Sequence, residues 1–169
     1  MRHLRFHTDR DVHGQSFLLQ RVQPGLSGLM DGSLSTLAPI FAVVLATHRP
    51  ITAFYTGLAT ALGAGVSMAF SEGLSDTGDL TGRGNPAVRG AITGGGTFIG
   101  GVFHTLPFLI SSYHAAIVAA VAVVAVELVV LAWLRYTFFQ TSFARSFVSV
   151  AVGGAIISAL SAGLGVAAG

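Results

Sequence analysis

Five long apolar segments follow one another along this chain and leave little polar sequence between them. They lie near residues 26–47, 51–74, 88–110, 114–134 and 146–168. About 20 residues of α-helix span the hydrocarbon core of a bilayer, and each segment meets or approaches that length. Backbone polar groups find no water in lipid and must be satisfied within each segment, as they are in a helix. The sequence therefore predicts an all-α integral membrane protein with five transmembrane helices.

The composition excludes an ordinary soluble domain. Of 169 residues, 52% are hydrophobic and 9% are charged, whereas a soluble domain carries about 25% charged residues. The basic residues stand between the apolar runs and do not gather on one amphipathic element, so we expect no nucleic-acid partner. Cysteine is absent, which excludes disulfides, thiolate metal sites and cysteine nucleophiles.

The arginines predict how the helices are oriented. Cytoplasmic segments of membrane proteins carry an excess of basic residues, and an N-terminus inside leaves only Arg49 in the outer loops. The other arginines then all lie inside: Arg2, Arg5, Arg10, Arg21, Arg83, Arg89, Arg135 and Arg145. We therefore expect an N-in/C-out, multi-pass protein of a bacterial inner membrane. We expect residues 23–169 to form its transmembrane domain.

Residues 1–22 are predicted to be a cytosolic tail. The tail has no apolar core, so we expect no cleavable signal peptide. Its histidines and aspartates leave two alternatives open, a metal-gathering tail or a solvated one. The residues concerned are His3, His7, His13, Asp9 and Asp11.

Small residues recur at helical spacing within the apolar segments and predict close helix packing. Such residues let helix backbones approach each other in membranes. They are Gly57, Ala61 and Gly65, then Gly96 and Gly100, then Gly154 and Ser158. Five helices form a thin bundle with little room for a polar pathway, so we expect a homodimer with the pathway at or near the seam.

The ionisable residues within the predicted spans include three carboxylates and a histidine: Asp31, Glu72, His104 and Glu127. A carboxylate at the centre of a membrane helix costs about 2.5–3.5 kcal/mol on insertion scales. Such side chains usually face a cavity or a partner. Each of the four is therefore a candidate for a functional site.

The first two helices are predicted to form a divalent-metal site at their cytosolic ends. Asp31 lies near that end of the first helix. Met68 and Glu72 share a face of the antiparallel second helix, and Asp76 and Asp79 extend that face if the helix continues. The thioether favours Fe²⁺, with Mn²⁺, Co²⁺ or Zn²⁺ behind it, over Mg²⁺ or Ca²⁺. Core filling by Met68 and an ordinary loop role for Asp76 and Asp79 remain as alternatives.

Three further residues are predicted to line a proton or transport path. Pro39 frees the backbone carbonyl of Ser35, which extends a polar track from Asp31. We expect His104 in the outer half of the membrane, as an exit-path residue, a proton acceptor or a buried structural histidine. We expect Glu127 in the inner half, as a proton relay or in a structural pair with Arg135 or another helix.

Several motifs resemble the vacuolar iron transporter family. The first helix reads LMDGSLSTLAPIFA and the second GAGVSMAFSEGLSD, which resemble that family's DG motif and its later SMA-x-x-E. The segments DLTGRGNP and FHTLPFLI and the five-helix plan extend the resemblance over about residues 20–169. Within it, the chain looks most like the membrane half of bacterial membrane-bound ferritins. Two known modules are not matched here, namely the cytosolic helical domain between helices two and three and the N-terminal ferritin-like domain.

The resemblance implies a function and its residues. The family moves Fe²⁺, and often Mn²⁺, out of the cytosol by proton antiport, as a dimer of five-helix subunits. Its translocation residues correspond to Asp31, Met68 and Glu72. We therefore expect a ferrous iron exporter, with no permanently bound cofactor. Alternatives are a manganese(II) exporter and a non-transporting membrane scaffold for a ferritin-like partner. If the chain is an exporter, the same ferritin-like partner is a possible metal donor.

Enzyme activity is not expected. The sequence contains no nucleophile–base motif, no nucleotide-binding loop and no paired E-x-x-H iron motif.

Overall fold

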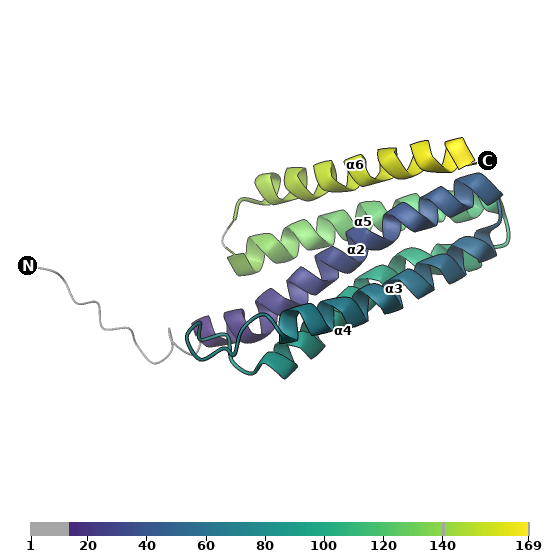
Figure 1. Cartoon of the computed structure of the whole chain (residues 1–169). Coiled ribbons are helices and arrows are strands. Elements are labelled where there is room, and N and C mark those ends of the chain that lie inside the picture. Colours follow the sequence, from purple (N-terminus) through teal and green to yellow (C-terminus); the bar gives the residue numbers. More distant parts are fainter. Residues whose placement is uncertain (1–13, 140, 169) are drawn as a thin grey trace, which may run out of the picture.

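The computed structural model describes residues 14–139 and 141–168, and all regular structure within them is helical (Figure 1). In chain order the elements are η1 (Leu18–Val22, a π-helix), α2 (Gln23–Thr47), α3 (Pro50–Gly73), α4 (Pro86–Thr105), η2 (Leu106–Leu109, a 3-10 helix), α5 (Tyr113–Phe139) and α6 (Phe143–Ala168). The predicted all-helical fold is confirmed. The histidines and aspartates of the tail, for which metal gathering and simple solvation are the two alternatives, lie outside the described residues.

The first membrane helix begins earlier than the sequence predicts. Residues 14–47 are helical without interruption, so the second half of the predicted tail belongs to the helix. Pro24 lacks the N–H that an α-helix would use, and the π-helical turn Leu18–Val22 stands directly before its helix. The wider turn accommodates the proline, and the helix is already continuous at residue 26, where the first apolar span is predicted to begin.

Four of the described helices are long and apolar enough to cross a bilayer. They are the first helix over Gly14–Thr47, then α3, α5 and α6. The protein is therefore a multi-pass membrane protein by the length and composition of its helices. The third predicted span, α4, is not among them, because it holds Arg89, His104 and three threonines within 20 residues.

Helix α4 is nevertheless a core helix of the bundle. It packs along both α2 and α3, while α6 packs against α2 and α5. Figure 1 shows the long helices side by side, with α5 and α6 on the opposite side of α2 from α3 and α4. All of the buried residues of α4 are polar or small: Arg89, Gly90, Thr93, Gly94, Thr97, Gly100, Gly101, His104 and Thr105. The polar side chains that make α4 less apolar than the four candidate spans therefore face the interior of the bundle.

The predicted close packing of small residues is confirmed for α3 and α4, and it joins α4 to both neighbours. It is not confirmed for Gly154 of α6, where a Cβ would meet only the Leu128 side chain at 3.8 Å. Gly57, Ala61 and Gly65 are all buried on α3. A Cβ atom at Gly32 of α2 would lie 1.9 Å from the backbone oxygen of Thr97 on α4. The α2 and α4 backbones are therefore in direct contact, which holds the polar side chains of both helices at defined positions.

Candidate functional site

A network of close polar contacts joins three helices in the middle of the bundle. The Ser33 hydroxyl on α2 bonds to Oε1 of Glu127 on α5. Nε2 of His104, at the end of α4, lies 2.9 Å from Oε2 of the same carboxyl group. The side chain of His104 is 3% exposed and that of Glu127 is 16% exposed. We call Ser33, His104 and Glu127 the span network.

The two ionisable members of the span network lie at one depth. The expectation that His104 and Glu127 occupy opposite halves of the membrane is wrong. Helix α5 continues to Phe139, five residues past its predicted end, so Glu127 stands near the middle of the helix. Helix α4 ends at Thr105, just before Pro107, so His104 is in its last turn.

Glu127 finds its partners on other helices and not in Arg135. A guanidinium nitrogen of Arg135 lies 3.5 Å from the sulfur of Met30 on α2. The sequence leaves open whether Glu127 pairs with Arg135 or with a residue of another helix, and the structure shows the second arrangement. Ser33 was not predicted, although it stands inside the same DGSLS stretch as Asp31 and Ser35.

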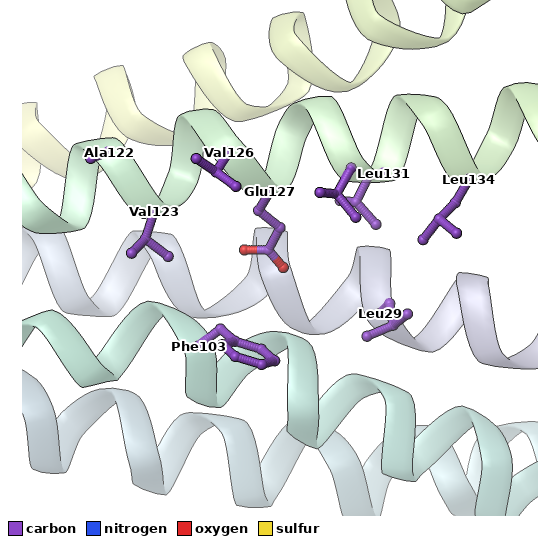
Figure 2. A pocket seen from close by; sticks show the side chains of 9 residues that line it. Leu29, Phe103, Ala122, Val123, Val126, Glu127, Leu131 and Leu134 are labelled. Atoms are coloured by element: carbon purple, nitrogen blue, oxygen red, sulfur yellow. The ribbon is translucent and has the colours of Figure 1, made fainter.

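An apolar cavity of about 470 Å³ opens between α2, α4 and α5 beside the span network. Figure 2 shows Glu127 projecting from α5 toward the helices opposite, among aliphatic neighbours of its own helix and Phe103 of α4. Glu127 is the single ionisable residue in this lining. The carboxyl group therefore has few polar neighbours besides Ser33 and His104.

A second polar group lies at the end of α3, where the loop to α4 begins. Arg83 donates to Oε1 of Glu72 at 2.6 Å and to Oδ2 of Asp76 at 3.1 Å. Arg89 donates to Oε1 of Glu72 at 2.9 Å and to Oδ1 of Asp76 at 3.1 Å. These four residues, the loop cluster, balance two carboxylates with two guanidinium groups.

Arg89 is the buried member of the loop cluster. Its side chain is 1% exposed, against 23% for Arg83. Its guanidinium group also donates to the backbone oxygens of Gly84 and Asp76 and to Ser75 Oγ, each at 3.4 Å. A buried charge is tolerated when it is paired and hydrogen-bonded in this way. Arg89 thus fixes the loop to the start of α4.

The loop cluster also lowers the pKa of Asp76. Burial by itself raises that pKa, but hydrogen bonds from Arg89 and from the Gly78 backbone, the positive charge of Arg89 and a hydrogen bond from Thr81 outweigh it. The carboxylate is therefore held in its charged form. The loop is also tied to the first helix, because Gln20 donates to the Gly82 carbonyl at 3.2 Å.

The five predicted metal ligands are only partly brought together. Glu72 and Asp76 meet in the loop cluster. Asp31 and Met68 are half-buried on separate helices, and Asp79 is exposed in the loop. In the part of the chain that the structure describes, no three His, Cys, Asp or Glu side chains group closely enough to hold a metal ion. The metal site stays a prediction.

Ser35 of the predicted path lies on α2, before the internal Pro39. Its hydroxyl oxygen is buried and has no hydrogen-bond partner among the described residues. The same holds for Thr93 on α4. Buried hydroxyl groups on α2 and α4 therefore extend the polar content of the bundle beyond the three members of the span network.

Sequence reasoning missed Ser33, Arg83 and Arg89 as site residues. A signal was present for the arginines, since Arg83 and Arg89 closely follow three carboxylates, Glu72, Asp76 and Asp79. Local charge complementarity of that kind predicts a salt-bridged loop. No comparable signal distinguishes Ser33 from Ser35, because the rotation of α2 decides which serine faces α5.

Comparison with protein-family models, curated proteins and solved structures finds no match to this chain. The resemblance to iron transporters therefore stays a prediction from the short motifs and the five-helix plan.

Proposed function

We propose that this protein exports ferrous iron from the bacterial cytosol in exchange for protons. The observation that carries the proposal is the His104–Glu127 pair, with Nε2 and Oε2 2.9 Å apart in the middle of the bundle. Ionisable residues inside a membrane are costly, and they mark ion pathways and proton relays. The cargo is assigned from the motifs around Asp31, Met68 and Glu72, which resemble those of iron transporters.

In this proposal the loop cluster receives the metal. A divalent cation would replace Arg83 between Glu72 and Asp76, because Arg83 is partly exposed whereas Arg89 is buried. The ion would then pass to Asp31 and Met68. A homodimer supplies the ligands that one chain does not gather, since a second copy brings the same residues to the seam.

The test is Fe²⁺ flux into or out of proteoliposomes, with and without an imposed pH gradient. Asp31→Asn keeps the size of the side chain and removes its charge, so we expect at least about a tenfold loss of flux. Ser67→Ala, on the exposed face of α3, is the matched control and should transport normally. Unchanged flux in a folded Asp31→Asn variant would refute the assignment.

Selectivity separates ferrous iron from manganese(II) as cargo. Met68 supplies a thioether, which a softer cation uses better than a harder one. We expect Met68→Ala to reduce Fe²⁺ flux more than Mn²⁺ flux when the two metals compete. Equal reduction of both would assign Met68 to packing and favour a manganese exporter.

One observation favours a second function, that of a non-transporting scaffold for a ferritin-like partner. Arg83 and Arg89 neutralise the two carboxylates of the loop cluster, which leaves them no net charge with which to attract a metal. A scaffold would show neither Fe²⁺ nor Mn²⁺ flux, yet it would co-elute with a purified ferritin-like protein. Flux that depends on Asp31 would exclude this alternative.

A further inference from the structure

The contacts of the span network determine how many protons it needs. Nδ1 of His104 lies 3.0 Å from the carbonyl oxygen of Gly100, and a carbonyl only accepts, so Nδ1 carries a hydrogen. A neutral imidazole has one ring hydrogen, which makes its Nε2 an acceptor. Nε2 lies 2.9 Å from Oε2 of Glu127, and an ionised carboxylate is also an acceptor. One additional proton between the two atoms turns this repulsive contact into a hydrogen bond.

Ser33 provides a place for a second proton. Its hydroxyl lies 2.7 Å from the carbonyl oxygen of Leu29 and also contacts Oε1 of Glu127. The single hydroxyl hydrogen of Ser33 can form a good hydrogen bond with only one of these two acceptors. If Oε1 is itself protonated, the carboxyl group donates to Ser33 Oγ, and Ser33 donates to Leu29. Every contact of the network is then a hydrogen bond.

We propose that the span network is an intramembrane proton-binding site that holds one shared proton at rest and takes up a second on Oε1 of Glu127. The resting state is neutral overall, and the second proton makes the network positive. A hydronium ion supplies the second proton: one of its O–H bonds breaks, an O–H bond forms on Oε1 of Glu127, and a water molecule is left. This inference deepens the proposed antiport and rests on it for its role in transport.

The second proton would weaken metal binding at Asp31 without sharing a ligand with the metal. Asp31 precedes Ser33 by two residues on α2, so their Cα atoms differ in depth by about 3 Å. Two positive charges at similar depth repel each other across an apolar interior, where little water screens them. Proton uptake and metal binding therefore oppose each other, and by linkage the effect is equal in both directions.

Few other charged groups face the span network from the helices packed around it. On α2 the nearest is Asp31, on α4 Arg89 lies near the opposite end, and on α5 Arg135 is two turns away. Helix α3 offers only the exposed Tyr55 between residues 50 and 70, and α6 has no titratable residue between 146 and 167. Protonation of Glu127 is thus governed mainly by His104 and Ser33.

Infrared difference spectroscopy of the full chain in lipid bilayers, without metal, tests the inference. Lowering the pH should produce the carbonyl-stretch band of a protonated carboxyl group, and Glu127→Gln should lack that band. Ser33→Ala changes no charged group, so it is the second test variant if Glu127→Gln fails to fold. It should bind the second proton about tenfold more weakly, the loss expected for one hydrogen bond.

Ser161→Ala is the matched control. Ser161 is a buried serine of α6 that bonds to the Ile157 carbonyl of its own helix, and its loss should leave the titration unchanged. A band independent of Ser33, or no band assignable to Glu127, would overturn the inference.

The two proposals fail separately. A Ser33-dependent band in a protein without metal flux would refute the transport function and keep the proton site. Metal flux without a titrating Glu127 band would keep the transport function and refute the proton site.

Discussion

Arg89 and Glu72 are bonded across 17 residues of chain, with Nε of the buried guanidinium group 2.9 Å from Oε1 of the carboxylate. Helix α3 ends one residue after Glu72, and α4 begins three residues before Arg89. The pair therefore closes the loop between these helices. Asp76 and Arg83 are the other two members of the loop cluster.

Removing either arginine should have very different effects on stability. Arg89→Met leaves two partly buried carboxylates short of a partner, and breaking a buried pair costs about 3–5 kcal/mol. Arg83→Met removes a partly exposed pair, worth about 0–1 kcal/mol. Unfolding of both variants in mixed detergent micelles gives the comparison. Equal destabilisation would show that burial of Arg89 does not govern the strength of the cluster.

The loop contact should depend on acidity through Asp76. Its pKa is lower in the folded protein than the ordinary 3.8, so the carboxylate stabilises the closed loop above about pH 4. That contribution is lost as the pH falls through the lowered pKa. A fluorophore on Leu80→Cys, a fully exposed loop position, reports the release. The same release in Asp76→Asn would assign the pH effect to another group.

Two adjacent glycines of α4 should respond in opposite ways to substitution by alanine. A Cβ at Gly94 would lie 2.4 Å from the backbone oxygen of Gly65, whereas a Cβ at Gly95 meets nothing within 4 Å. Gly94→Ala should force α3 and α4 apart and cost more than about 1 kcal/mol. Gly95→Ala should be neutral or stabilising by up to about 1 kcal/mol, because alanine favours the helix. Thermal melts in detergent distinguish the two, and similar melting temperatures would contradict the close approach of α3 and α4.

Orientation in the membrane can be tested with single cysteines, because the natural chain has none. An N-in arrangement places Leu80, between α3 and α4, in the cytosol and Ser112, between η2 and α5, outside. In intact cells an impermeant thiol reagent should label Ser112→Cys and leave Leu80→Cys unmodified until the cells are opened. The reverse pattern would invert the topology and move the loop cluster to the outer surface.

Hydropathy alone was enough to predict most of the helices. Long apolar runs in α2, α3, α5 and α6 are helical whatever they pack against, because lipid offers their backbone groups no other partner. Their ends were predicted less well. The π-turn before Pro24 carries the first helix back to Gly14, and α5 extends past Arg135 to Phe139.

The sequence also identified Asp31, Glu72, His104 and Glu127 as the ionisable groups of the spans, since charge in an apolar run is visible in one dimension. Only the tertiary structure decided which of them meet. His104 contacts Glu127, and Glu72 contacts Arg83 and Arg89, because the rotation of each helix and the path of the loop determine which side chains face each other. Helix rotation and loop path depend in turn on glycine contacts such as that of Gly32 with Thr97. In such a contact, two backbone segments that are far apart in the sequence lie directly against each other.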